Sequence, residues 1–337
     1  RGLGDVYKRQ VLLSLAIAII ATILNQYVHI IGASVFALLM GMAINFFMKD
    51  TTTYKAGITF SSKKLLKVAI VLLGTSLSVS QIIHVGKYSL VVMVFTLAAA
   101  FGFGYLFGKL FKMDWKLSSL ISAGTGICGG TAVATLSQVI DADDSDVAYA
   151  ISATFIFDVV MVILFPIMGA ALGLSDMAFG LWAGTAVNDT SSVVAAGYAY
   201  SDAAGDFATI VKLTRTLSII PVVLAFSYLN EKLKMKQNAG AAVEQKKVNL
   251  KKIFPWFILL FLGAALLNSV GIIPAALSST LSTLSKFFMV MALAAIGLKT
   301  DIRDVTKSGF LPMLHGFIIS AIVVIVALLV QVLLGQV

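Results

Sequence analysis

The chain has 337 residues, of which 59% are hydrophobic and 12% charged, and its mean hydropathy is +0.98. No soluble globular domain can bury that much apolar surface, so the composition indicates an integral membrane protein. The net charge of +9 does not indicate nucleic-acid binding, because the 25 basic residues gather in a few loops between apolar stretches. A single cysteine, Cys128, excludes an intramolecular disulfide and a cysteine-based metal cluster.

The first ten residues, RGLGDVYKRQ, contain neither an initiator Met nor an apolar core. We therefore interpret residues 1–10 as a non-native or flexible leader and not as a secretory signal. Residues 11–337 are expected to form a single transmembrane domain of the all-α class, a polytopic helical bundle. Apolar runs of roughly 17 to 25 residues recur along it, each long enough to cross a hydrocarbon core of about 30 Å as a helix.

Eleven membrane spans are predicted, with ten as the alternative, because LNQYVHIIGA must turn the chain between two rather short helices. The predicted spans are 11–30, 31–48, 65–83, 89–108, 117–138, 147–171, 179–198, 207–229, 253–269, 280–298 and 308–335.

The loop charges predict an orientation for this bundle. If the spans alternate in direction, 20 of the 25 basic residues fall on one side, including those of the loop 109–116 and of a basic linker at 230–252. The other side receives Lys87 and the acidic loop 141–146. The positive-inside rule then predicts a cytoplasmic linker and N-terminus and, with eleven spans, a C-terminus outside.

Five ionisable residues fall within the predicted spans: Asp158, Asp189, Lys212, Arg215 and Lys286. A charge near the centre of a membrane helix costs about 2.5 to 3.5 kcal/mol, so each is a functional candidate. Lys212 and Lys286 lie close enough to span ends that the alternative is snorkelling to the headgroups. Asp158 and Asp189 lie too deep for that, and their alternative role is a structural ion pair or cap.

Lys212 and Arg215 are three residues apart and share one helix face. A buried guanidinium stays charged and needs a carboxylate, carbonyl groups or a bound anion beside it. The pair therefore predicts half of an anion site, with neutralisation of Arg215 by Asp158 or Asp189 as the alternative.

Two similar segments interrupt apolar stretches: GTGICGGTAVAT at 124–135 and GTAVNDTSSVVA at 184–195. Glycines and hydroxyl residues at such points let a helix break, and a half-helix N-terminus with free amides is a ready anion site. The alternative is close packing of small residues. The predicted substrate-binding residues are Gly124, Thr125, Gly126, Cys128, Gly129, Thr131, Asn188, Thr190, Ser191, Ser192, Lys212 and Arg215, with Asp189 and Asp158 as ion-coupling residues.

A second internal similarity relates 74–86 to 297–309, as expected of transporters built from repeats. The two offsets, about 60 and about 223 residues, cannot both come from one duplication. The sequence contains no Walker loop, dinucleotide fingerprint, HExxH or GxSxG, and its three histidines are scattered. We therefore expect no enzyme activity, no metal centre and no cofactor beyond a coupling Na⁺ or H⁺.

The sequence resembles the sulfate exporter family, bacterial multi-pass proteins of the cation/proton antiporter and bile-acid symporter superfamily. The resemblance covers nearly the whole chain and is carried by these stretches: GTGICGGTAV, VAYAISATFIFDVV, FGLWAGTAVNDTSSVVAAG, ATIVKLTRTLSIIP, PWF and AAIGLKTDIRDVTKSG. It implies inverted repeats, broken helices, alternating access and a place in the bacterial inner membrane. Two departures are Asn188-Asp189, where the family has His-Glu, and Asp158, where an uncharged residue is expected.

These observations predict a secondary active transporter for a small anion, such as sulfate or another sulfur oxyanion, coupled to H⁺ or Na⁺. The alternatives are a Na⁺/H⁺ antiporter and, from another class, a passive channel or a non-transporting membrane scaffold. The expected partners are the small anion and the lipid bilayer, with no nucleic acid, and the sequence is compatible with a homodimer.

Overall fold

A computed structural model of the chain describes residues 3–27, 32–47, 55–237, 254–299 and 309–337. Within these ranges the protein is helical and contains no strand, which confirms the predicted all-α membrane bundle. The leader from residue 3 to residue 10 belongs to the first helix, and linker residues 238–252 lie outside the described ranges. So do residues 300–308, which make up most of the second copy of the weaker internal similarity.

The helices follow in chain order: α1 Leu3–Tyr27, α2 Gly32–Phe47, α3 Lys55–Phe60, the π-helix η2 Ser61–Leu65, α4 Leu66–Leu73, the 3₁₀ turn η3 Gly74–Ser76, α5 Val79–Leu110, α6 Trp115–Ala123, the π-helix η4 Gly124–Cys128, α7 Gly130–Ile140, α8 Asp144–Ala171, α9 Asp176–Ala186, α10 Thr190–Tyr200, α11 Asp202–Thr216, α12 Ile219–Gln237, α14 Trp256–Ser269, α15 Ala275–Lys299 and α17 Phe310–Leu333.

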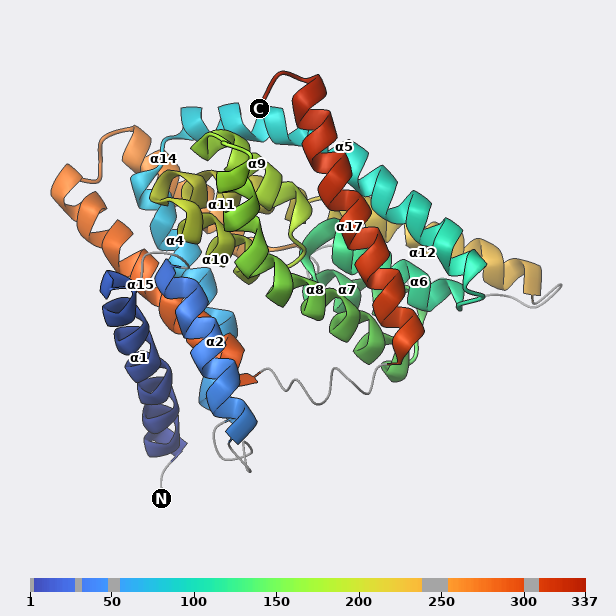
Figure 1. Cartoon of the computed structure of the whole chain (residues 1–337), viewed down its shortest axis with the longest axis horizontal. Coiled ribbons are helices and arrows are strands. Elements are labelled where there is room, and N and C mark those ends of the chain that lie inside the picture. The colour runs from blue at the N-terminus through green and yellow to red at the C-terminus, as the bar shows by residue number, and fades with distance from the viewer. Residues whose placement is uncertain (1–2, 28–31, 48–54, 238–253, 300–308) are drawn as a thin grey trace.

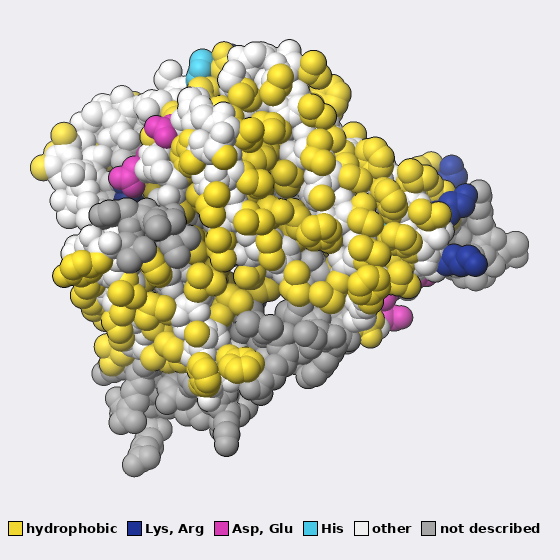
Figure 2. All heavy atoms as spheres, in the orientation of Figure 1, with side chains coloured by type: hydrophobic (Ala, Val, Ile, Leu, Met, Phe, Trp, Pro, Cys, Tyr) yellow, Lys and Arg dark blue, Asp and Glu magenta, His cyan; other side chains and the backbone are white. Residues whose placement is uncertain are grey.

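Five described helical stretches are long and apolar enough to cross a membrane: Val79–Leu110, Ser145–Ala171, Asp202–Lys234, Ala275–Lys299 and Phe310–Leu333. Their outward faces carry large apolar side chains such as Leu106, Leu164 and Leu329, which suit a hydrocarbon environment. Figure 2 shows this surface, in which hydrophobic side chains dominate and most Lys and Arg side chains in view gather at one end.

The predicted span 117–138 is a helical hairpin and not a crossing. Lys116, at the start of α6, donates from Nζ to the carbonyl oxygen of Asp141 at 2.6 Å, just beyond the end of α7. The two arms, α6 with η4 and then α7, therefore begin and end at the same end of the molecule. We call residues 115–140 hairpin 1. The chain reverses at Gly129, whose φ of +65° is open to glycine and strained for other residues.

The predicted span 179–198 is a second hairpin, formed by α9 and α10. The Tyr200 hydroxyl donates to the carbonyl oxygen of Leu174 at 2.5 Å, and Ser201 Oγ donates to Asp176 Oδ1 at 2.6 Å. The rings of Phe179 and Tyr200 stack with their centroids 4.0 Å apart. These contacts close the base of what we call hairpin 2, residues 176–200.

The hairpins enter the bundle from opposite ends. Helix α8 connects the base of hairpin 1 to the base of hairpin 2, and its 28 residues span about 42 Å. The chain then returns through α11 and α12, Asp202–Lys234, to the first end, where Lys234 Nζ pairs with Asp141 Oδ2 at 2.6 Å.

This ion pair corrects the predicted orientation of the acidic loop. Because hairpin 1 reverses, 141–146 lies at the same end as 109–116 and Lys234, and not on the opposite side. Two predicted crossings are thereby removed, so the number stays odd and the predicted sides of the two termini are unchanged. Which end faces the cytoplasm remains a prediction from the loop charges.

The third predicted span is displaced. Helices α3, η2 and α4 run without interruption from Lys55 to Leu73, so Lys63 and Lys64 are helical and not part of a loop. The chain turns at 74–78, and α5 then starts with Ser78, whose side chain accepts from the backbone N–H of Gln81 in a capping box. Lys87 therefore lies within α5.

Figure 1 shows α1, α2 and α15 together on one side of the molecule and α6, α12 and α17 on the other, with α5 running from one side to the other and the hairpins reaching between them. Where the α1–α2–α15 group meets the hairpins, the buried contacts are apolar, as between Leu38, Leu293 and Ala195. At the hairpin 2 end a polar contact joins the groups, because Lys286 Nζ lies 2.8 Å from Asp202 Oδ2. Lys286, only partly exposed, thus has an acidic partner, which the snorkelling interpretation did not foresee.

Candidate functional site

The tips of the two hairpins touch inside the bundle. A Cβ placed on Gly129 of hairpin 1 would lie 2.9 Å from Asp189 Oδ1 and 3.2 Å from the Asp189 Cα of hairpin 2. Glycine at 129 thus allows both the chain reversal and the close approach. The two similar segments of the sequence, 60 residues apart, are these two tips.

Lys212 of α11 binds the backbone of both tips. It is fully buried, and its ammonium donates to the carbonyl oxygens of Ile127 at 2.8 Å, Val187 at 3.1 Å and Asn188. An ammonium has three donors, and these three bonds use all of them. The snorkelling interpretation of Lys212 is therefore wrong, because the side chain points into the bundle and not to its surface.

Arg215, one turn later on α11, has the same role. Its Nε donates to the Gly126 carbonyl oxygen at 2.6 Å, Nη1 to that of Val187 at 3.0 Å, and Nη2 to that of Thr125. In the described part of the chain, no carboxylate lies within 4.0 Å of its guanidinium. Neutralisation by Asp158 or Asp189 through a direct ion pair is therefore also wrong.

The physical reason for both contacts is the broken helices. Each first arm, α6 with η4 and α9, ends inside the protein with carbonyl groups that lack intrahelical partners and carry partial negative charge. Two cations of one helix satisfy these carbonyl groups in both hairpins at once. The positions three apart on α11 indicated a shared face correctly, but that face meets backbone.

Asp158 of α8 satisfies the opposite kind of helix end. It is 1% exposed, and its two carboxylate oxygens accept from the backbone N–H groups of Asn188 and Asp189, each at 2.9 Å. These N–H groups lie immediately before the first residue of α10, Thr190, where the helix dipole favours a negative charge. Asp158 is thus a cap on the tip of hairpin 2, which was the structural alternative considered for it.

Asp189 differs from the other three charges because it is partly exposed. It is the N-cap residue of α10, and its Oδ2 accepts from the backbone N–H of Ser191 at 2.9 Å and from the Ser191 hydroxyl. Its other oxygen, Oδ1, faces Gly129 at the meeting point of the tips. Asp189 therefore has one carboxylate oxygen that lies against the tip of hairpin 1.

The remaining predicted site residues divide by exposure. Thr131, two residues after Gly129, is exposed, and Thr190, next to Asp189 in the chain, is partly exposed. The buried ones are Gly124, Thr125, Gly126, Cys128, Asn188, Ser191 and Ser192. Among these, Gly124 and Gly126 are packing positions, since a Cβ would lie 2.7 Å from Thr154 Cγ2 and 3.1 Å from Ala100 Cβ, respectively.

Two residues at the tips were not predicted, Ser320 of α17 and Thr154 of α8. Asn188 Nδ2 donates to Ser320 Oγ at 3.3 Å and to the Thr154 carbonyl oxygen at 3.4 Å. Ser320 Oγ also lies 3.4 Å from Thr125 Oγ1. A hydroxyl in the strongly apolar helix Phe310–Leu333 is a weak signal, and only the packing of α17 against the tips gives it meaning.

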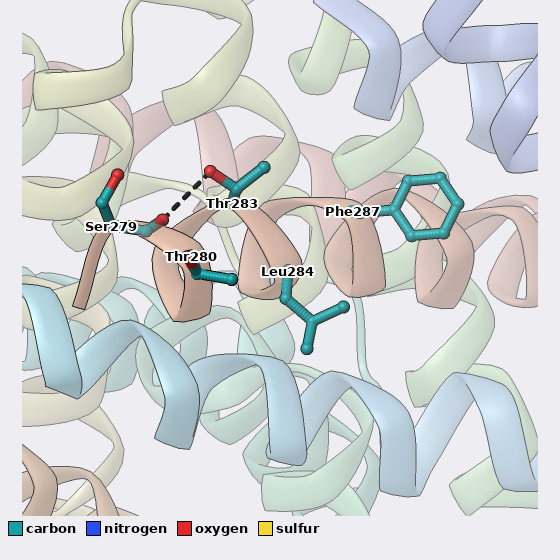
Figure 3. A pocket seen from close by; sticks show the side chains of 5 residues that line it. All are labelled: Ser279, Thr280, Thr283, Leu284 and Phe287. Carbon is teal, nitrogen blue, oxygen red and sulfur yellow. Dashed lines mark hydrogen bonds between the residues drawn. The ribbon is translucent and has the colours of Figure 1, made fainter. Parts of the chain in front are cut away.

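Two other features do not add to this site. A shallow groove along α15 is lined by Ser279, Thr280, Thr283, Leu284 and Phe287, all from one helix (Figure 3). The Thr283 hydroxyl there donates to the carbonyl oxygen of Ser279 at 3.0 Å, so it is occupied by its own helix. In the described residues, no group of three or more His, Cys, Asp or Glu side chains is placed to hold a metal ion.

Comparison with other proteins identifies relatives along almost the whole chain. A family described as "Conserved hypothetical protein 698" matches residues 9–316. A "UPF0324 membrane protein" of Clostridium tetani is 60% identical over 339 residues, covering 98% of each chain. Proteins of the same name from Streptococcus pneumoniae and Streptococcus mutans are 43% and 41% identical, covering 96% and 95% of each chain. The names of these three relatives describe membrane proteins.

Proposed function

The chain belongs to the family of multi-pass membrane proteins described as conserved hypothetical protein 698, and we propose that it is a secondary active transporter. In this proposal a small solute and a coupling cation bind where the two hairpin tips meet. The observation that carries it is the meeting of Gly129 and Asp189, at which Asp189 alone of four nearby charges is partly exposed.

Three of the four charges are engaged by backbone. Asp158, Lys212 and Arg215 are each at most 1% exposed and bind the amides or carbonyl groups of the broken helices. Asp189 is partly exposed and keeps one oxygen at the contact between the tips. A carboxylate that is held in place but accessible suits an ion that must bind and leave in every cycle. We therefore assign Asp189 to the coupling cation, H⁺ or Na⁺.

The exposed start of α7 supports a small anion as the solute. Helix α7 begins at Gly130 without a side-chain cap, and the exposed Thr131 follows. Free backbone N–H groups and the helix dipole favour an anion there. Sulfate or another sulfur oxyanion is the substrate class that the sequence resemblance implies. A cation on Asp189 would lower the repulsion between this anion and the carboxylate, which gives a physical reason for coupled binding.

The layout of the bundle suits alternating access. The hairpins enter from opposite ends, so each tip is connected to a different side. Between the hairpins and the α1–α2–α15 group the buried contacts are apolar, as between Leu38 and Ala195. Apolar surfaces can slide or rock with few directional bonds to break, and relative movement of two groups about a central site is how such transporters work.

A Na⁺/H⁺ antiporter is the second candidate, and one observation favours it. Lys212 and Arg215, which were predicted to hold the anion, use all three ammonium donors and three of five guanidinium donors on tip carbonyl groups. If Asp189 alone binds the transported ion, no anion site is required.

Purified full-length protein in liposomes tests the proposal. Uptake of radiolabelled sulfate is measured with an imposed Na⁺ or H⁺ gradient, and a pH-sensitive dye inside the vesicles reports Na⁺/H⁺ exchange without sulfate. Saturable sulfate uptake that requires one of the gradients is the expected result. Na⁺-driven pH change with no anion requirement would establish the antiporter instead, and flux that does not saturate would indicate a channel.

Asp189→Asn is the matched variant for this experiment, because it keeps the shape of the side chain and removes its charge. We expect it to lose the dependence on the cation gradient while the melting temperature stays close to that of the wild type. Asp143→Asn removes an exposed carboxylate at the base of hairpin 1 and serves as the control. Full ion dependence in Asp189→Asn would assign Asp189 a purely structural role.

A further inference from the structure

A second group of oxygen atoms lies behind the hairpin tips, around Asn188. This side chain is fully buried, and its Oδ1 has no hydrogen-bond partner. Its Nδ2 is engaged by the Thr154 carbonyl oxygen and by Ser320 Oγ, at 3.4 and 3.3 Å. A buried amide oxygen without a partner costs free energy, so a native protein that keeps one commonly uses it for a ligand or a bound water.

The neighbouring carboxylate is also incompletely satisfied. Each oxygen of Asp158 accepts one backbone N–H, from Asn188 or Asp189, although a carboxylate oxygen has two lone pairs. In the ranges that the structure describes, no Lys or Arg nitrogen lies within 4.0 Å of it. A carboxylate that is 1% exposed therefore lacks a direct counter-charge.

Two hydroxyl groups complete the cluster. Thr125 Oγ1 of η4 and Ser320 Oγ of α17 lie 3.4 Å apart, and both side chains are fully buried. Asn188 connects them to the carboxylate, because its backbone N–H binds Asp158 while its side chain reaches Ser320. The cluster thus combines one carboxylate, one amide oxygen and two hydroxyls from four separate elements.

We propose that this cluster binds a single Na⁺ ion. Hard cations prefer carboxylate, carbonyl and hydroxyl oxygens, and the cluster contains no sulfur or imidazole ligand. One carboxylate matches a monovalent ion, whereas Ca²⁺ sites use several. The tip carbonyl groups, which often hold Na⁺ in transporters, are taken by Lys212 and Arg215, so side-chain oxygens replace them.

The position of the ion gives it a role in the cycle. Thr125 belongs to hairpin 1 and Asn188 to hairpin 2, so one ion there joins the two tips to α8 and α17. Asp158 also accepts the N–H of Asp189, so the ion orders the residue assigned to coupling. This role in the transport cycle rests on the proposed function. Na⁺ binding itself can be measured without transport.

Thermal unfolding of the purified full-length protein in detergent tests the site. NaCl is titrated against KCl and choline chloride at constant ionic strength. For the wild type we expect a saturable rise of the melting temperature, about 3 °C or more, with Na⁺ alone. Asp158→Asn should abolish the response, and Ser320→Ala should raise the midpoint Na⁺ concentration about tenfold through loss of one ligand.

Ser118→Ala is the matched control for Ser320→Ala. Ser118 is another buried serine, near the start of α6 and away from the tip. Its hydroxyl donates to the Gly104 carbonyl oxygen and contacts His315. We expect an unchanged Na⁺ midpoint in this variant. If Asp158→Asn does not fold, Ser320→Ala against Ser118→Ala decides the question.

Three results would overturn the site: equal responses to Na⁺ and K⁺, an unchanged Na⁺ midpoint in Ser320→Ala, or stabilisation by low pH with no response to Na⁺. The last result would assign a proton to Asp158. Failure of this site and failure of the proposed function remain distinguishable, because sulfate uptake without Na⁺ binding removes only the site. Na⁺ binding without any transport removes only the function.

Discussion

The two hairpins share a broken-helix design but differ in their surroundings. In hairpin 2, residues 178–188 and 191–197 are buried, so its arms are enclosed by other helices. In hairpin 1, the second arm exposes Thr131, Ala134 and Gln138 on one face. One face of the second arm of hairpin 1 is therefore not covered by other helices, while hairpin 2 contributes a carboxylate held within the bundle.

Their second arms also begin differently. Two carboxylates lie at the start of helix α10, because Asp189 is its N-cap and Asp158 accepts from the backbone N–H groups of Asn188 and Asp189 just before the helix. Helix α7 starts after Gly129 with no side-chain cap. Two carboxylates at a helix N-terminus repel a third negative charge, whereas an N-terminus without a side-chain cap can bind an anion. In the proposed function, the break in hairpin 2 serves the coupling cation and the break in hairpin 1 serves the anionic solute.

The largest expected effect is the difference in accessibility to a thiol reagent between the bases of the two hairpins. In a Cys128→Ala background, single cysteines replace the exposed residues Asp143, Lys232 and Ala203. With an impermeant thiol reagent on intact cells, cysteines at 143 and 232 should behave alike, both labelled or both protected, and a cysteine at 203 should behave in the opposite way. The reason is that the bases of the two hairpins lie at opposite ends of the bundle. Labelling of 143 together with 203 would restore a membrane crossing at 117–138.

Arg215→Ala should destabilise the protein more than any other single change at the tips. It leaves the carbonyl oxygens of Thr125 and Gly126 in hairpin 1 without their guanidinium donor and removes one of the two donors to that of Val187 in hairpin 2, and we expect a loss of about 3 to 5 kcal/mol. Arg215→Lys should retain part of this stability, because one ammonium cannot replace the guanidinium fork. Melting temperatures in detergent measure both, with Lys109→Ala as the exposed control. A wild-type melting temperature for Arg215→Ala would contradict the role assigned to α11.

Gly129→Ala tests the contact between the tips. Its positive φ and the 2.9 Å approach to Asp189 Oδ1 should cost about 1 to 3 kcal/mol, and transport should fall with it. Gly130→Ala is the matched control, since a Cβ there would meet only Ile151 at 3.8 Å. We expect this variant to be close to neutral or slightly stabilising. Equal stability of the two variants would mean that the tips do not meet as described.

The smallest changes in the free energy of unfolding are expected for side chains at the bases of the two hairpins. Tyr200→Phe removes a hydrogen bond to the Leu174 carbonyl oxygen and should cost about 0.5 to 1.5 kcal/mol. Lys234→Ala removes a partly exposed ion pair with Asp141, which we expect to be worth about 0 to 1 kcal/mol. Thermal unfolding at low and high salt separates them, because only the second should weaken with added salt.

Much of this arrangement could be predicted from local sequence. The apolar runs determine an all-α membrane bundle, and the breaks at 124–129 and 187–189 follow from glycines and polar residues inside them. The intramembrane charges were singled out for the same reason, since a charge in hydrocarbon needs a partner. These are properties of short segments, which periodicity and composition report directly.

Only the tertiary structure decided what the breaks and charges do. A glycine-rich break looks the same in sequence whether the chain continues across the membrane or reverses, as it does at Gly129. The partners of the freed backbone groups are distant, as with Arg215 and the carbonyl oxygen of Gly126, 89 residues apart. Local sequence determines where backbone hydrogen bonds are lost, but the packing of α8, α11 and α17 against the tips determines which side chains replace them.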